Sequence, residues 1–196
     1  MIRLALLRHG PTDWNRAGRI QGRSDIPLDD QARADLSGFH LPPPWDSADL
    51  WSSPLLRAAD TARIVGGRAP QTAPELTEMN WGDWEGKRGM DLLADPTSGF
   101  RHIEHWGWDY HAPGGESPAD LWDRLQPWLA SLQRDTVAVC HIGIMRILLA
   151  RAHGWDFDGA APFAVKRNRL FILHYDNGLL TAEPDPVRLL PTGPTP

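Results

Sequence analysis

The first apolar run of this chain and the turn after it constrain its fold more than any other stretch. The run Leu4–Leu7 ends in Arg8, His9 and Gly10. Short apolar runs bounded by glycine and proline are typical of buried strands, and open α/β sheets bind ligands at the carboxyl ends of such strands. A histidine and an arginine beside a glycine, which permits close backbone approach, indicate an anionic ligand, although a lone histidine at a strand end is more often structural.

Length and composition set further bounds. The 196 residues, 41% of them hydrophobic, are enough for one domain with a real core and a subsidiary cap. The net charge of −5 argues against a broad nucleic-acid or anionic-membrane surface. The single cysteine, Cys140, excludes an intramolecular disulfide. The first apolar run is too short for a signal peptide or a membrane span. We therefore expect a cytoplasmic protein with neither nucleic-acid nor membrane partners, while the sequence leaves its oligomeric state open.

Apolar runs and helical periodicities alternate along the chain, which predicts an α/β fold: a three-layer α/β/α sandwich with a mostly parallel central sheet. We expect strands over residues 2–7, 49–52, 71–73 and 136–140, helices over 29–39, 55–65 and 142–153 with another after Ser117, and a hairpin over 169–182. The Trp-rich, irregular residues 75–115 predict a small irregular or helical cap. We assign residues 1–183 to a single domain and 184–196 to a loose, Pro-rich tail.

Four chemically distinctive sites lie at the ends of these elements or between them. Arg8 and His9 follow the first strand, and His141 follows a later one. Arg57 lies in the first turn of the helix after the second strand, and Glu78 lies among apolar residues. Since the carboxyl ends of parallel strands share one edge of a sheet, we expect His9, Arg57 and His141 to converge.

The motifs around these residues resemble those of the histidine phosphatase superfamily, in the branch that contains cofactor-dependent phosphoglycerate mutases and their phosphatase relatives. The resemblance covers residues 2–175, in the family's order. One block alone is weak evidence, but all of them in order make a specific match. The blocks are Leu7-Arg8-His9-Gly10, Thr12, Trp14-Asn15, Ile20-Gln21-Gly22, Ser53-Pro54-Leu55-Leu56-Arg57-Ala58, Thr61-Ala62, Glu78, Trp84-Glu85-Gly86, Cys140-His141, Gly143 and Arg146.

The resemblance implies phosphoryl transfer through the protein, with His9 as the nucleophile that becomes phosphohistidine. It implies that Arg8, Arg57 and His141 hold the phosphate, and planar guanidinium groups suit the charge that spreads over the phosphoryl oxygens. Glu78 resembles the general acid, which needs a pKa raised by its apolar neighbours and later takes a proton from the attacking water.

The resemblance extends to substrate contacts: Asn15, Gln21 and Gly22 match positions that touch substrate in relatives. It implies no metal and no other cofactor, because arginine and histidine side chains supply the positive charge that a metal ion would otherwise provide. It also implies that the protein binds a small-molecule phosphomonoester as its substrate. Glu85 competes with Glu78 for the acid role, although the motif favours Glu78.

Three other features permit different interpretations. Cys140 is more typical of a small buried strand residue than of a nucleophile. Gly114-Gly115 lacks the Lys-Ser/Thr ending of a phosphate-binding P-loop. A metal cluster is an alternative whose spacing does not match His-Glu-x-x-His; its members would be His102, His105, Asp109 and His111.

Two departures from the family bear on the reaction. Ile142 stands where many relatives have glycine, which narrows the pocket, and the chain lacks counterparts of the additional cap segments of the mutases. A mutase must shield its intermediate from water. We therefore expect a metal-independent phosphatase, with a phosphoglycerate-type mutase or a binding protein without turnover as alternatives. An aromatic cap predicts a substrate with an apolar or ring-bearing part; its tryptophans are Trp81, Trp84, Trp106 and Trp108.

Overall fold

The structure, a computed structural model, describes residues 1–193. Its strands are β1 (Ile2–Arg8), β2 (Phe39–His40), β3 (Asp49–Ser52), β4 (Gln71–Thr72), β5 (Thr136–Cys140), β6 (Arg169–Asp176), β7 (Leu179–Ala182), β8 (Val187–Arg188) and β9 (Leu190–Pro191). Its helices are α1 (Asp13–Arg16), α2 (Asp30–Ser37), α3 (Leu56–Gly66), α4 (Gly89–Ala94), α5 (Pro118–Ser131) and α6 (Ile142–His153), with the 3-10 turns η1 (Pro74–Leu76) and η2 (Gly82–Trp84).

Local sequence explains where the long helices begin and end. The Ser117 hydroxyl accepts the N–H of Asp120 at 3.1 Å, and the Asp120 carboxylate accepts the N–H of Ser117 at 3.0 Å. This reciprocal pair satisfies two amides at the start of α5 that have no partner within the helix. Asp29 caps α2 by accepting the N–H of Ala32 at 2.7 Å. α6 stops at Gly154, whose φ of 64° is the left-handed conformation that glycine adopts without strain.

A seven-stranded sheet forms the centre of the molecule, in the order β4-β3-β5-β1-β6-β7, with β8 also paired to β6. The pairings among β1, β3, β4 and β5 are parallel. The pairings made by β6 are antiparallel. The predicted α/β fold is confirmed, and the parallel strands form the half of the sheet whose carboxyl edge carries the residues singled out above.

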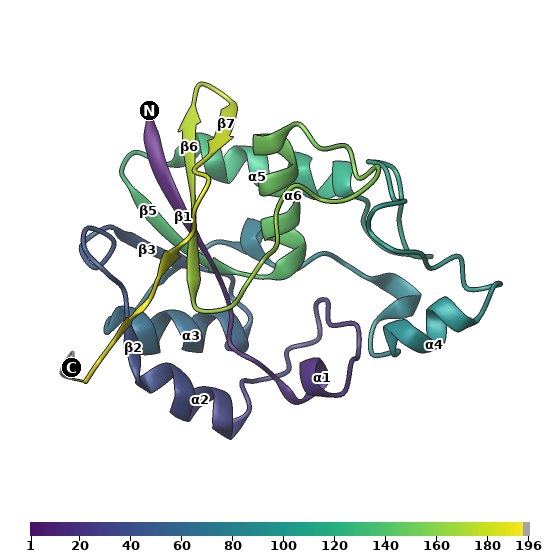
Figure 1. Cartoon of the computed structure of the whole chain (residues 1–196), viewed down its shortest axis with the longest axis horizontal. Helices are drawn as coiled ribbons and strands as arrows, with labels where there is room; N and C mark the ends of the chain where they lie inside the picture. Colours follow the sequence, from purple (N-terminus) through teal and green to yellow (C-terminus); the bar gives the residue numbers. More distant parts are fainter. Residues whose placement is uncertain (194–196) are drawn as a thin grey trace.

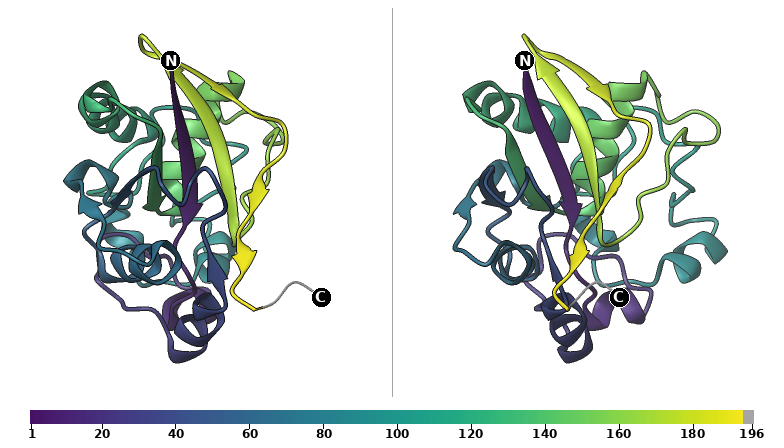
Figure 2. Two further views of the ribbon diagram at one scale, coloured as in Figure 1. Left: turned by 90° about the vertical axis from the view of Figure 1, so that its left-hand side faces the viewer. Right: turned by 60° about the vertical axis from the view of Figure 1, so that its left-hand side comes forward.

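Helices cover both faces of this sheet. Leu4 and Leu6 of β1 pack in the core that contains α5 and α6, whereas Ala5 and Leu7 pack in the core that contains α2 and α3. Alternate residues of a strand point to opposite faces, so a continuous apolar run suits a strand buried on both sides. Figure 1 shows α2 with α3 on one side of the strands and α5 with α6 on the other, and Figure 2 shows β1 and β6 side by side between them.

The cap segment (residues 75–115) contributes no strand to the sheet, and Figure 1 shows its helix α4 well away from the strands. Its interior is aromatic. Trp84 packs edge-on against Phe100 with ring centroids 5.1 Å apart, and Trp106 stacks on Tyr110 at 5.3 Å. Such pairs stabilise a segment that has no regular hydrogen-bond ladder of its own.

The expectation of a loose tail from residue 184 is wrong for the part that the structure describes. β8 pairs with β6, and β9 pairs with β2. Leu189 lies between these strands and is buried in the core shared with α2 and α3. Apolar burial therefore outweighs the proline content, whereas residues 194–196 lie outside the described part. Among residues 1–193, no helix combines the length and apolar character needed to cross a membrane.

Candidate active site

Three chain segments meet at the carboxyl end of the parallel strands. Arg8 of β1 lies opposite Cys140 of β5, and Val139 of β5 lies opposite Ser52 of β3. After β1 the chain passes to α2 on one face, and after β5 it passes to α6 on the other face. Open α/β sheets bind ligands in the crevice where neighbouring strands send their connections to opposite faces.

His9 follows β1 directly and is oriented by its own backbone. Its ring Nδ1 lies 2.6 Å from the carbonyl oxygen of Gly10. A carbonyl can only accept, so Nδ1 carries the proton and Nε2 keeps its lone pair. Burial, and then the positive charges of Arg57 and Arg167, lowers the pKa of His9 well below 6.5. The ring is therefore neutral near pH 7, with a nitrogen able to act as a nucleophile.

His141 is the residue before α6, and its fully buried ring faces His9. The two ring centroids are 5.1 Å apart, with the planes tilted by 57°. Neither ring nitrogen of His141 has a hydrogen-bond partner in residues 1–193. Burial, then His9 and Arg57, lowers the pKa of His141 well below 6.5. A neutral His141 can donate one hydrogen bond to an oxygen between the two rings.

Two arginines flank the histidines and differ in their contacts. Arg57 of α3 is fully buried; its Nη1 donates to the carbonyl of Ser24 at 2.8 Å and its Nη2 to that of Gly22 at 2.7 Å. Its Nε has no partner among the described residues. Nε of Arg8 is also buried without a partner there. Buried guanidinium N–H groups without protein acceptors fit an anion, which accepts such bonds more strongly than a neutral group.

Glu78 is buried against the start of α6. Its Oε1 accepts the N–H of Met79 at 2.8 Å, and its Oε2 accepts the N–H of Gly143 at 3.1 Å. Burial raises the pKa of Glu78 above 4.5, and these two bonds oppose the rise. A Cβ at Gly143 would lie 2.2 Å from Oε1, so only glycine permits this approach. A buried carboxyl with a raised pKa can donate a proton near neutral pH.

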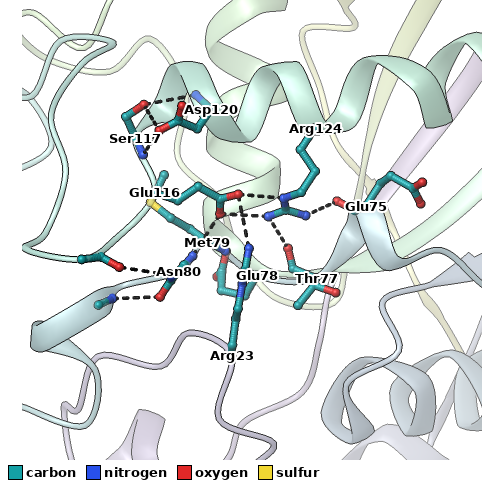
Figure 3. A network of polar contacts seen from close by, with 12 residues as sticks. Arg23, Glu75, Thr77, Glu78, Met79, Asn80, Glu116, Ser117, Asp120 and Arg124 are labelled. Atoms are coloured by element: carbon teal, nitrogen blue, oxygen red, sulfur yellow. Dashed lines mark hydrogen bonds and ion pairs between the residues drawn. The ribbon is translucent and has the colours of Figure 1, made fainter.

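A network of charged and polar groups anchors the loop that carries Glu78 (Figure 3). Arg124 of α5 donates to two carbonyls of this loop, at 2.5 and 2.9 Å. Arg124 also donates to the Glu116 carboxylate at 2.8 Å, and the other oxygen of Glu116 accepts the N–H of Asn80 at 3.0 Å. The chain is thus held before and after Glu78 by groups that do not line the cavity described next.

A cavity of about 190 Å³ lies beside these groups. Arg57 and His141 are fully buried and do not line the cavity, and Gly22 turns its carbonyl to Arg57. The structure thus brings all eight predicted residues to one place but exposes only part of the set. The predicted residues that line the cavity are Arg8, His9, Asn15, Gln21 and Glu78.

Sequence reasoning missed three arginines. Arg146 of α6 and Arg19 line the cavity. Arg167 donates to the backbone carbonyl of His9 and, at 3.1 Å, to Oδ1 of Asn15. Arg146 is among the residues that match the family's motifs, but we assigned it no function from the sequence. Arg167 precedes β6, and no local pattern ties it to His9, because only the pairing of β6 with β1 brings it there.

The structure bears on three alternative interpretations: Glu85 as the acid, Cys140 as a nucleophile, and a metal cluster. Glu85 accepts the N–H of Ser24 at 2.5 Å and does not line the cavity, so it supports a loop rather than facing a substrate. Burial raises the pKa of Cys140, which keeps its thiol protonated and unreactive. Throughout residues 1–193, no three histidine, cysteine or acidic side chains gather as a metal site would require.

The cap tryptophans divide into two pairs. Trp81 and Trp106 line the cavity together with Phe100. Trp84 is buried in the core, and the indole N–H of Trp108 donates to Asp156 at 2.7 Å. The cavity therefore has a charged wall from the strand ends and an aromatic wall from the cap segment.

Comparison with known proteins identifies the family of the chain. The model of the histidine phosphatase superfamily (branch 1) matches residues 4–183. A glucosyl-3-phosphoglycerate phosphatase of Mycolicibacterium vanbaalenii is 31% identical over 173 residues, which are 80% of this chain and 76% of the relative. An adenosylcobalamin/alpha-ribazole phosphatase of Escherichia coli is 31% identical over 176 residues, covering 84% and 85%. The crystal structure of a phosphoglycerate mutase from Thermus thermophilus superposes with a TM-score of 0.74 at 31% identity, covering 96% and 99%.

The α/β fold thus brings two histidines and two arginines together at the carboxyl end of the parallel strands, beside a cavity. The chain belongs to the histidine phosphatase superfamily, branch 1. It is a histidine-type phosphomonoester hydrolase that acts on a small phosphorylated substrate.

Proposed function

We propose that the chain hydrolyses its phosphomonoester through a phosphohistidine formed on Nε2 of His9. The observation that carries the proposal is the arrangement of that nitrogen. It keeps its lone pair because Nδ1 donates to Gly10, and its ring faces that of His141 at 5.1 Å, beside the cavity that Glu78 also lines. A cytoplasmic location stays a prediction from the single, buried cysteine.

In the first step the lone pair of Nε2 forms a bond to phosphorus while the ester P–O bond breaks. The Glu78 carboxyl gives its proton to the departing alcohol oxygen. The His9 ring becomes cationic, and the bond from Nδ1 to the Gly10 carbonyl stabilises that charge. Arg8, Arg57 and His141 donate to the phosphoryl oxygens, where negative charge is greatest in the transition state.

In the second step a water molecule attacks the phosphoryl group and the P–N bond breaks. The Glu78 carboxylate takes one proton from that water, which restores the acid for the next turnover. Inorganic phosphate leaves and His9 returns to its neutral form. Asn15 and Gln21 line the cavity at positions suited to further bonds with the phosphoryl oxygens, and Gly22 acts by holding Arg57.

Replacing the proposed nucleophile tests this mechanism. His9→Ala should lower kcat by about 10³-fold or more, because no other side chain replaces the attacking nitrogen. Calorimetry should find inorganic phosphate still bound, since Arg8 and Arg57 remain. The wild-type protein, quenched during turnover, should gain the mass of one phosphoryl group in an acid-labile form on the peptide that contains His9. A His9→Ala variant with near-normal kcat contradicts the assignment.

Mutase activity is the second candidate, because one similar solved structure is a phosphoglycerate mutase. Two relatives named as phosphatases favour hydrolysis, and Ile142 lines the cavity where a smaller residue would leave more room. Phosphate release and phosphoglycerate isomerisation should be assayed in parallel, with and without bisphosphoglycerate. Rapid isomerisation with little released phosphate would replace the hydrolase with a mutase.

A further inference from the structure

Arg146 is a charged residue of the cavity that the proposed mechanism does not use. It lies in the second turn of α6, four residues after Ile142, so both side chains lie on the same face of the helix. Both line the cavity. Three aromatic residues of the cap segment line the same cavity: Trp81, Phe100 and Trp106. Arg146 therefore meets whatever part of a substrate extends from the strand ends toward the cap.

The contacts of Arg146 differ from those of the other arginines nearby. Arg57 and Arg124 each donate to two backbone carbonyls, and Arg19 donates to the Gly86 carbonyl at 2.8 Å. The guanidinium of Arg146, like that of Arg8, has no hydrogen bond or ion pair within residues 1–193. Two guanidinium groups thus share one cavity without an acceptor from the described part of the chain.

Burial, and then the positive charge of Arg8, lowers the pKa of Arg146 to about 10, while Glu78 opposes this. The group still carries its charge at neutral pH. Two neighbouring cations that face one cavity without a protein acceptor attract an anion. An anionic ligand can accept hydrogen bonds from the guanidinium groups of both Arg8 and Arg146.

The position of Arg146 distinguishes it from the phosphate clamp. Gly143, in the first turn of α6, donates its N–H to Oε2 of Glu78 at 3.1 Å. Arg146 lies three residues further along the same helix, so it lies on the same face as Gly143 and on the side of the cavity that holds Glu78. In the proposed mechanism Glu78 marks the side from which the alcohol departs. Arg146 therefore lies on the leaving-group side of the phosphate.

We propose that Arg146 binds a second anionic group, a carboxylate on the alcohol part of the substrate, and so selects phosphomonoesters of hydroxy acids that also carry an apolar or ring-bearing portion. The planar guanidinium can donate two parallel bonds to a carboxylate. Trp81, Phe100 and Trp106 pack against the apolar portion. This proposal rests on the function proposed above, because it needs Glu78 to mark the leaving-group side.

The test compares phenyl phosphate with its 3- and 4-carboxy derivatives, which add a second negative charge to the same ring. The wild-type protein should hydrolyse the best carboxyphenyl phosphate with a kcat/KM about 10-fold or more above that of phenyl phosphate. Arg146→Met should lower kcat/KM for that ester by about 10- to 100-fold and for phenyl phosphate by less than about 3-fold. Arg146→Lys should keep part of the preference, because it keeps the charge without the planar fork.

Arg134→Met is the matched control, since Arg134 is exposed and pairs with Asp49 at the amino end of the strands. It should leave both rates unchanged. Equal losses on both esters in Arg146→Met, or no loss on either, overturn the proposal. A wild-type preference below about 3-fold does so as well, independently of how any variant folds. If the wild-type protein hydrolyses none of these esters, the proposed hydrolase fails together with this inference, whereas hydrolysis without charge preference removes the inference alone.

Discussion

The two walls of the cavity are built by different means. At the sheet edge, His9 and His141 are placed by neighbouring parallel strands, and their positions follow from the backbone register of Arg8 with Cys140. In the cap segment, side chains are placed by other side chains, through aromatic stacking and through the network of Arg124 and Glu116. A strand register moves only in whole residues, whereas a side-chain network can shift gradually.

This difference separates the residues proposed to act on the phosphoryl group from the aromatic residues proposed to contact the rest of the substrate. The histidines proposed to react with and hold the phosphoryl group stand at the strand ends, whereas the aromatic side chains proposed to face the rest of the substrate stand in the cap segment. Glu78 is the exception, because it is a proposed catalytic group held by the second kind of support. Precise placement of a general acid therefore depends on contacts outside the sheet.

Glu78→Gln should have the largest effect of the three changes that probe this comparison. The amide keeps the shape but cannot donate the proton, so kcat should fall by about 10²- to 10⁴-fold for alkyl phosphates. The loss should shrink for 4-nitrophenyl phosphate, whose leaving group needs no proton.

The same variant tests the pH dependence of the reaction. Activity of the wild-type protein should fall as pH drops through the lowered pKa of His9, when the nucleophile is protonated. It should also fall as pH rises through the raised pKa of Glu78, when the acid is lost. Glu78→Gln should abolish the second decline only. A basic limb that persists unchanged in this variant assigns the acid to another group.

Arg124→Met should have an intermediate effect, because it releases the loop carbonyls on one side of Glu78 and leaves the carboxyl itself intact. We expect kcat for alkyl phosphates to fall by about 10-fold, with KM nearly unchanged and the basic limb of the pH profile displaced. Arg3→Met is the matched control, since Arg3 makes a comparable two-atom pair with Asp135 far from the cavity. If Arg124→Met and Arg3→Met lower kcat equally, Arg124 contributes to the stability of the fold and does not position Glu78.

Trp106→Ala should have the smallest effect. Trp106 stacks on Tyr110 and meets Trp81 edge-on at 5.4 Å, and it lines the same cavity as Arg146. Loss of one aromatic contact should lower kcat/KM for 1-naphthyl phosphate by about 3- to 10-fold and leave glycerol phosphate within about 2-fold. Trp122→Ala, outside the cavity, controls for the loss of a partly buried tryptophan. If ring-bearing and ring-free esters respond equally, the cap does not select for a ring.

Much of the fold was accessible from local pattern. The apolar runs of β1 and β5, the Ser117 capping box and the Gly154 stop each depend on neighbours within a few residues, so the predicted elements and the observed ones nearly coincide. The prediction of a loose tail was wrong because this part of the structure depends on distant segments and not on local sequence. β8 and β9 are held by partners far away in the chain, and Leu189 between them is buried by helices of the amino-terminal half.

For the candidate site, the sequence alone determined which chemical groups stand at strand ends and helix starts, because strand and helix boundaries follow from apolar periodicity and capping residues. Only the tertiary structure decided their relations: a 5.1 Å separation between histidines 132 residues apart, the bond from the N–H of Gly143 to Glu78, and Arg146 without a partner among residues 1–193. Those relations depend on burial and on contacts across the whole chain. Desolvation and the distances between charges exist only once the chain has folded.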